Sequence, residues 1–154
     1  MVRQVTLDQL CTFRLGSLYL GIDVREVREV LYHADITHVP HAHPAVRGLI
    51  NLRGQIATTI DLRTRLQVDE EGTDRRPVHV VVQSEGEQVT MLVDAIGDVI
   101  DTDPEIYEEP PSTMVGSARE LIVGTYKLDD ELLLVLDVEK VVQLEQPELE
   151  GTER

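Results

Sequence analysis

The chain has little sulfur and few aromatic side chains: its 154 residues include one Cys, no Trp, one Phe and four Tyr. A single cysteine, Cys11, excludes a disulfide within the chain. Cys11 lies in an alternating apolar segment without a neighbouring acid–base motif, which indicates a buried, inert thiol. Because aromatic residues are so few, the core must consist mainly of Val, Leu and Ile, and the β-branched residues among these favour strands.

Long hydrophobic runs and targeting signals are also missing. The densest apolar run, LLLVL at 132–136, is far shorter than the roughly 20 residues of a membrane-spanning helix. The first ten residues, MVRQVTLDQL, lack the apolar central region of a signal peptide. We therefore expect a cytoplasmic protein without direct membrane insertion.

Basic residues are scarce, with 14 Lys and Arg against 29 Asp and Glu and a formal net charge of −15. This charge repels a nucleic-acid backbone and an anionic membrane surface. Small β-barrels that bind oligonucleotides use aromatic stacking on a basic face, and this chain lacks both features. The composition therefore predicts no nucleic-acid partner.

Common catalytic motifs are absent as well. The sequence has no phosphate-binding loop of the G-x-x-x-x-G-K type, no G-x-S-x-G turn and no H-E-x-x-H helix. Acidic pairs such as Glu108-Glu109 and Asp129-Asp130 fall in predicted loops and turns, where nothing indicates an enclosed catalytic cleft. We therefore expect a protein that is not an enzyme.

Four histidines gather within eleven residues, and imidazole is a common ligand of zinc and nickel. On an extended segment, His41 and His43 would point the same way. However, no cysteine joins them, two prolines make the segment a loop, and no second ligand cluster occurs. We expect neither a metal nor a cofactor, and a metal-binding enzyme that uses this loop stays open as an alternative. The histidines are His33, His38, His41 and His43.

Short segments with strand-like alternation recur along the chain. Residues 11–15 and 18–22 form a predicted hairpin, and one helical turn after Asp23 precedes a strand that ends at Leu31. Further strands are expected within 48–62, 78–100 and 121–136, and Asp137 caps a last helix. The pattern predicts an all-β fold with a short C-terminal helix.

A faint internal repeat links the two halves of the chain. Gly48 and Gly124 are each followed, at the same spacings, by three apolar residues and an aspartate. Two small β-barrels packed together would explain the repeat, since closure removes exposed strand edges. The repeated positions are Leu52, Ile56, Ile60 and Asp61 in the first half, and Leu128, Leu132, Leu136 and Asp137 in the second.

The predicted hairpin at 48–62 bends at Arg53-Gly54. Gly54 can adopt the positive φ that a tight turn requires, and Arg53 then projects from the tip. The equivalent turn in the second half carries Asp129-Asp130, so the turn itself does not require a base. Arg53 is therefore either a solvated turn residue or a partner contact, because arginine is frequent at protein interfaces.

These segments, in order and with fitting gaps, resemble the CheW family of bacterial chemotaxis coupling proteins. The resemblance covers most of residues 11–144, and VRGLINLRG followed by IDLR is its most specific part. The run IATTID departs from the family pattern, because it is more polar and has Thr58 where proline is common. The other matching segments are FRLGSLYLGIDVREVREVL, ITHVPHAHPA, VDAIGDVI and DELLLVLDVEKVV.

The resemblance implies a single CheW-like domain over 9–146, built from two five-stranded Src-homology-3-like β-barrel subdomains that share a core. We expect the subdomains at approximately 15–75 and 76–146, with flexible ends at 1–8 and 147–154.

The resemblance also implies a non-enzymatic adaptor, monomeric alone, that links methyl-accepting chemotaxis receptors to the regulatory domain of a CheA-type histidine kinase. We expect it to be recruited from the cytoplasm to receptor arrays at the inner face of the membrane. No kinase core precedes the module and no receiver domain follows it, so the free-standing adaptor is a better match than CheA or CheV. A paralogous adaptor in a non-swimming chemosensory pathway stays open.

The resemblance further implies which residues contact the receptor. It predicts an amphipathic receptor hairpin in an apolar groove, with an arginine at the groove edge. The apolar members of this set could equally be core residues. The implied contact residues are Val27, Glu29, Gly48 and Arg53, with Ile96 and Val99 on the second barrel beside the same groove.

Overall fold

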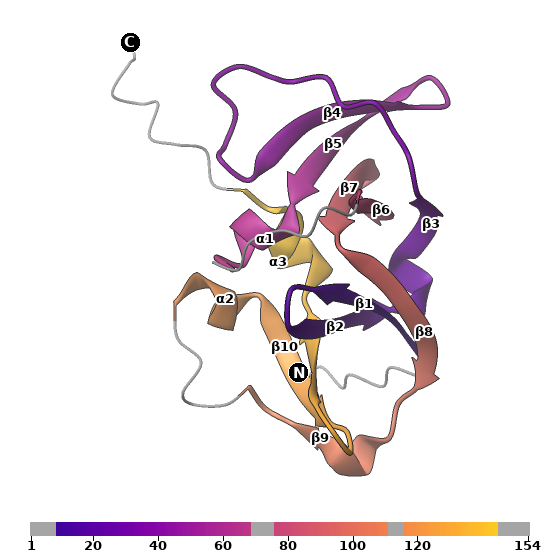
Figure 1. The fold of residues 1–154 in the computed structure, drawn as a ribbon, viewed down its shortest axis with the longest axis vertical. Coiled ribbons are helices and arrows are strands. Elements are labelled where there is room, and N and C mark those ends of the chain that lie inside the picture. The colour runs from indigo at the N-terminus through magenta and orange to yellow at the C-terminus, as the bar shows by residue number, and fades with distance from the viewer. Residues whose placement is uncertain (1–8, 69–75, 111–115, 145–154) are drawn as a thin grey trace.

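The computed structural model describes residues 9–68, 76–110 and 116–144, which form mainly short strands (Figure 1). The expected flexible ends, 1–8 and 147–154, lie outside these ranges. No helix within them has the length and hydrophobicity needed to cross a membrane. The strands are β1 (Gln9–Leu15), β2 (Leu18–Asp23), β3 (Val27–Leu31), β4 (Val46–Leu52), β5 (Gln55–Asp61), β6 (Val78–Ser84), β7 (Glu87–Val93), β8 (Ala95–Asp101), β9 (Tyr107–Glu108), β10 (Ile122–Lys127) and β11 (Leu132–Leu136). The helical segments are η1 (Val24–Glu26), α1 (Leu62–Arg65), η2 (Pro104–Ile106), α2 (Ser117–Glu120) and α3 (Val138–Val142).

The strands form two sheets, one in the upper and one in the lower part of Figure 1. The six-stranded sheet has the order β8-β1-β2-β11-β10-β9, and the five-stranded sheet has the order β3-β6-β7-β5-β4. The parallel pairs are β11 with β2 and β5 with β7. The predicted all-β fold with two sheets and a short C-terminal helix is confirmed, although the two-residue β9 adds a sixth strand to one sheet. Closure of each sheet into a barrel stays a prediction.

Each half of the chain contributes strands to both sheets. The β1–β2 hairpin lies in the six-stranded sheet, whereas β3, β4 and β5 join the β6–β7 hairpin in the five-stranded sheet. Conversely, β8 pairs with β1, and β11 pairs with β2. The expected division near residue 76 is therefore not the boundary between the sheets. Local sequence patterns do not specify which distant strand a hairpin will pair with.

The internal repeat corresponds to this exchange of strands. In each half a hairpin joins a sheet through a parallel pairing and then enters a short helix. Asp61 accepts hydrogen bonds from the backbone N–H groups of Arg63 and Thr64 in α1, and Asp137 accepts one from that of Lys140 in α3. The sequence pattern predicts α3 but misses α1, although Asp61 is the repeat equivalent of Asp137.

Some strands, β11 and the middle of β6 among them, have apolar side chains buried on both faces. In β11, Leu134 and Leu136 belong to one buried cluster, and Leu133 and Val135 belong to another. The middle of β6 alternates between two clusters in the same way. Since successive side chains of a strand point to opposite faces, the continuous runs LLLVL and VHVVV fit strands that are buried on both sides.

One buried cluster joins the two sheets. It contains Phe13 and Leu20 from the six-stranded sheet, Val80 and Met91 from the five-stranded sheet, and side chains of α1 and α3. These two helices lie near the middle of the molecule (Figure 1). The predicted shared core is therefore present.

The polar residues of β5 take part in a buried hydrogen-bonded row. Thr59 is fully buried, and the Thr90 hydroxyl of β7 donates to its hydroxyl oxygen at 3.0 Å. His79 of β6, also buried, places Nδ1 3.4 Å from the Thr90 hydroxyl. Burial lowers the pKa of His79, and the charge of Arg47 adds to this effect. The polar run IATTID is thus accommodated because its buried hydroxyl finds a partner.

Candidate functional site

Val27 and Glu29 lie on β3, the terminal strand of the five-stranded sheet. Asp23 accepts a hydrogen bond from the backbone N–H of Arg25 at the start of η1, and the chain then extends into β3 at Val27. This confirms the predicted helical turn followed by a strand. Val27 is half-buried against the shared core. Val27 therefore has a packing role, whatever else it contacts.

Arg53 and Gly54 form the two-residue loop between β4 and β5, as predicted. Both have positive φ, 53° at Arg53 and 88° at Gly54, as in a type I′ turn. The Gly54 N–H also donates to Asn51 Oδ1 at 2.7 Å. The positive φ at Arg53 itself is uncommon for a residue other than glycine, and the sequence pattern does not predict it.

An ion pair joins Arg53 to Glu29. Arg53 Nη1 donates to Glu29 Oε2 at 3.0 Å, and Nη2 donates to Oε1 at 2.5 Å. The hydrogen bond between them lowers the pKa of Glu29 and raises the pKa of Arg53. The side chain of Arg53 is 72% exposed and that of Glu29 25%. The pair thus connects the β4–β5 turn to β3, at opposite ends of the strand order, on the surface.

Gly48 is buried in β4, where its missing side chain makes room for another segment. Its φ is +151°, and a Cβ there would lie 2.7 Å from Ile36 Cγ2 and closer still to the carbonyl oxygen of Thr37. Two backbone hydrogen bonds of 2.8 Å join Thr37 to Leu49 at this point. Gly48 therefore has a packing role, and a direct contact with a partner stays a prediction.

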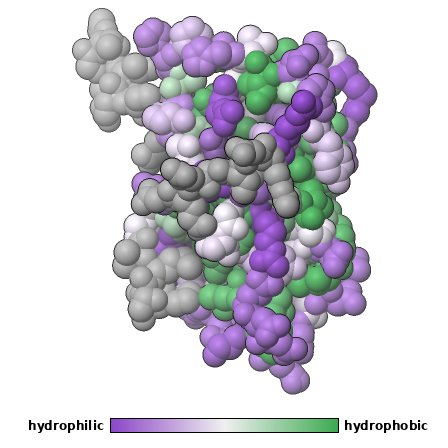
Figure 2. Space-filling view, viewed as in Figure 1, coloured by the Kyte–Doolittle hydropathy of each residue, from purple (hydrophilic) through white to green (hydrophobic). Residues whose placement is uncertain are grey.

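Ile96 and Val99 lie on β8, the terminal strand of the six-stranded sheet. Ile96 packs against the shared core, whereas Val99 is 51% exposed. Figure 2 shows hydrophobic surface along the edge of the molecule where Figure 1 places β8. β3 and β8 run along the same side in the view of Figure 1. Four of the six predicted residues therefore lie on β3 and β8, and Gly48 lies on β4, which is also the last strand of its sheet.

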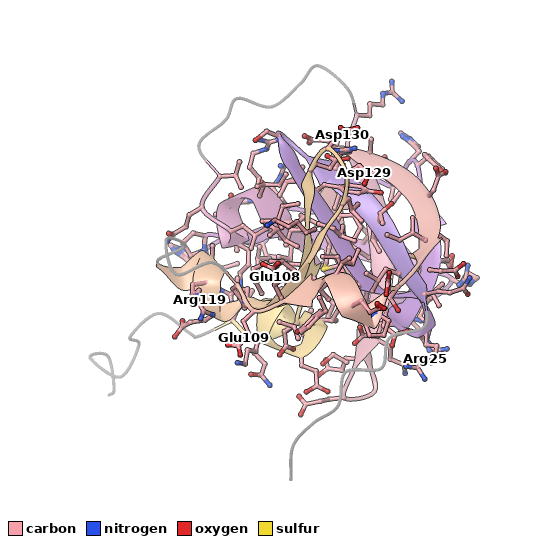
Figure 3. The ribbon with its side chains drawn as sticks, turned by 90° about the horizontal axis from the view of Figure 1, so that it is seen from below. Arg25, Glu108, Glu109, Arg119, Asp129 and Asp130 are labelled. Atoms are coloured by element: carbon pink, nitrogen blue, oxygen red, sulfur yellow. The ribbon has the colours of Figure 1, made fainter. Side chains whose placement is uncertain are left out.

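The structure brings no metal-binding cluster together in the described residues. No three His, Cys, Asp or Glu side chains are arranged there to hold a metal ion. The pair Glu108-Glu109 lies apart from Asp129-Asp130 (Figure 3).

The prediction of a buried thiol is wrong in degree. Cys11 lies in β1 and is only partly buried. Burial nevertheless raises the pKa of the thiol, with the charge of Asp23 as a second cause. A raised pKa disfavours the reactive thiolate, in keeping with an inert thiol.

Comparison with known proteins shows the family to which this chain belongs. Residues 9–146 match the family model described as a CheW-like domain. The chain belongs to the CheW family. It is 31% identical over 137 residues to the chemotaxis protein CheW of Treponema pallidum, which covers 86% of this chain and 81% of the relative. It is 29% identical over 139 residues to the chemotaxis protein CheW of Klebsiella aerogenes, which covers 90% of this chain and 84% of the relative.

A solved structure supports the same CheW fold. The crystal structure of the scaffolding protein TtCheW from Thermoanaerobacter tengcongensis matches with a TM-score of 0.81 at 26% sequence identity. The match covers 96% of this chain and 95% of that chain. The resemblance to the CheW family seen in the sequence is therefore confirmed.

Proposed function

We propose that this chain is a non-enzymatic adaptor that couples the cytoplasmic tips of chemoreceptors to the regulatory domain of a CheA-type histidine kinase. The Arg53–Glu29 pair carries the proposal, because it joins two residues of the implied receptor contact on the surface. In this proposal a receptor hairpin lays its apolar stripe along β3 and β8, above Val27, Ile96 and Val99. The adaptor is a cytoplasmic monomer when alone and is recruited to receptor arrays.

The ion pair prepares Arg53 for a partner. Glu29 orients the guanidinium in the unbound protein, so less side-chain entropy is lost when a receptor binds. A guanidinium has five N–H donors, and the two that bond Glu29 leave others for carbonyl or carboxylate oxygens of the receptor. The pair therefore acts as one unit in this proposal.

The experiment replaces Arg53 by glutamate and measures receptor pull-down, kinase coupling and melting temperature together. Arg53→Glu removes the guanidinium and places two carboxylates side by side, so we expect receptor binding to weaken roughly tenfold or more. Because the position is exposed, we expect the melting temperature to be unchanged. Lys127→Glu is the matched control, because it makes the same charge change at an exposed residue of β10. The control should couple normally.

The charge-swapped double variant, Arg53→Glu with Glu29→Arg, tests whether the guanidinium must stand at position 53. We expect it to keep the ion pair but not to restore receptor binding. Normal binding by Arg53→Glu alone would show that Arg53 is only a turn residue. A large fall in its melting temperature would show that the pair is structural.

A further inference from the structure

An open pocket with a volume of about 730 Å³ lies where the loop before β4, α1, α2 and the end of α3 meet. None of the six predicted receptor-contact residues lines it. Leu121, Ile122 and Leu144 form its apolar part, and the first two are nearly fully buried. The rest of the lining is polar, and this pocket plays no part in the proposed receptor contact.

The charge of the pocket is the reverse of that of the whole chain. Its lining includes four basic residues and a single acidic residue, Glu120. In the complete sequence, acidic residues outnumber Lys and Arg by 29 to 14. Separate segments supply the basic side chains, so the tertiary structure alone gathers them. They are His43, Arg65, Arg119 and Lys140.

Two of these groups are held in place by hydrogen bonds. Arg65 Nε donates to the carbonyl oxygen of Val141 at 2.9 Å, and Nη2 donates to that of Lys140 at 2.8 Å. The backbone N–H of Ala45 donates to His43 Nδ1 at 3.0 Å, which places the proton of a neutral ring on Nε2. His43 is therefore an oriented N–H donor at the wall of the pocket, and Arg65 is a fixed positive charge there.

The other two basic groups have no acidic partner in the part of the chain that the structure describes. The six ion pairs there use Arg14, Arg25, Arg47, Arg53, Arg63 and Lys127. Arg119 projects from α2 at the outside of the molecule (Figure 3). Arg119 and Lys140 thus bring positive charge to the pocket, and no described carboxylate forms an ion pair with either of them.

We propose that this pocket binds an oxyanion, the phosphate or carboxylate group of a ligand. His43, Arg119 and Lys140 can donate hydrogen bonds to it, and Arg65 adds a fixed positive charge. Charged donors bind carboxylate and phosphate oxygens most strongly. Arginine suits both groups because its planar fork matches their geometry. A free phosphate and a carboxylate of an acidic peptide offer the same chemistry, and the volume admits either.

The test follows backbone amide signals by NMR while inorganic phosphate is added to the full chain at constant ionic strength, balanced with sodium chloride. We expect saturable shifts at residues 118–122 and 138–143. Tri-glutamate peptide forms the second arm of the titration. Tighter binding of the peptide would assign the site to acidic protein segments, and tighter binding of phosphate would assign it to free phosphate-bearing ligands.

Matched variants make the proposal falsifiable. Arg119→Ala and Lys140→Ala should each weaken binding roughly tenfold, because each removes a charged donor. Lys127→Ala, which removes a lysine outside the pocket, should bind like the wild type. Glu120→Gln should bind more tightly, since it removes the opposing charge. Absence of saturable shifts, or unchanged binding by Arg119→Ala with a normal melting temperature, would overturn the proposal.

Discussion

At the scale of single residues, two positions of the β4–β5 hairpin have different physical roles. Gly48 is buried and touches the 36–37 segment, whereas Arg53 is exposed and bonds Glu29. The family resemblance assigns both to one receptor contact. The structure separates them, because only Arg53 presents a side chain to the surface.

We predict that Gly48→Ala destabilises the protein by about 2–3 kcal/mol, since an added Cβ overpacks the contact with Ile36 and Thr37. Chemical denaturation measures the change. Gly86→Ala is the matched control, because Gly86 also has positive φ but nothing lies within 4 Å of an added Cβ. It should lose only about 1 kcal/mol. Equal losses in the two variants would contradict the packing role of Gly48.

At the scale of elements, β6, β7 and β5 are tied by the buried row of His79, Thr90 and Thr59. The pKa of His79 is lowered in the fold, so protonation favours the unfolded chain. The contribution of the neutral His79 side chain to stability is complete above the unfolded-state pKa of about 6.5. That contribution is lost as the pH falls from there towards the folded-state pKa.

We therefore predict that the free energy of unfolding decreases on acidification below about pH 6.5 and that His79→Gln reduces this slope. Denaturant titrations at a series of pH values measure it. His38→Gln, at an exposed histidine, is the control and should keep the wild-type slope. The same slope in His79→Gln would show that another group causes the pH dependence. The slope is the informative quantity, because replacing a buried side chain also lowers stability at every pH.

At the scale of the whole molecule, the exchange of strands makes the two halves interdependent. Each sheet takes a hairpin from one half and three or more strands from the other. The shared cluster also joins residues of both halves, such as Phe13 and Met91. Neither half can complete a sheet or bury its share of this cluster alone.

We predict one cooperative unfolding transition and no stable fold for either fragment, 1–75 or 76–154, alone. A fragment of about 75 residues that lacks two or more strands of each sheet buries too little surface to be stable. NMR dispersion of each fragment, and of the two mixed, tests this. Mixing should restore the spectrum of the intact chain. A dispersed spectrum from 76–154 alone would show that the second half folds independently.

The sequence by itself determined the features that depend on neighbouring residues. Alternation over 11–15 and 18–22 gives the first hairpin, Gly54 permits the turn at Arg53, and Asp137 caps the last helix. These follow from the period of a strand, the freedom of glycine and a side chain that bonds its own backbone nearby. The matching motifs likewise sufficed to indicate the CheW family.

Only the tertiary structure decided what depends on distant segments. Arg53 meets Glu29 across 24 positions of sequence, and the basic pocket gathers side chains from four segments. The exchange of strands between the sheets is of the same kind. Any apolar strand of the right length satisfies a local pattern, and the partner it pairs with is chosen by burial over the whole chain.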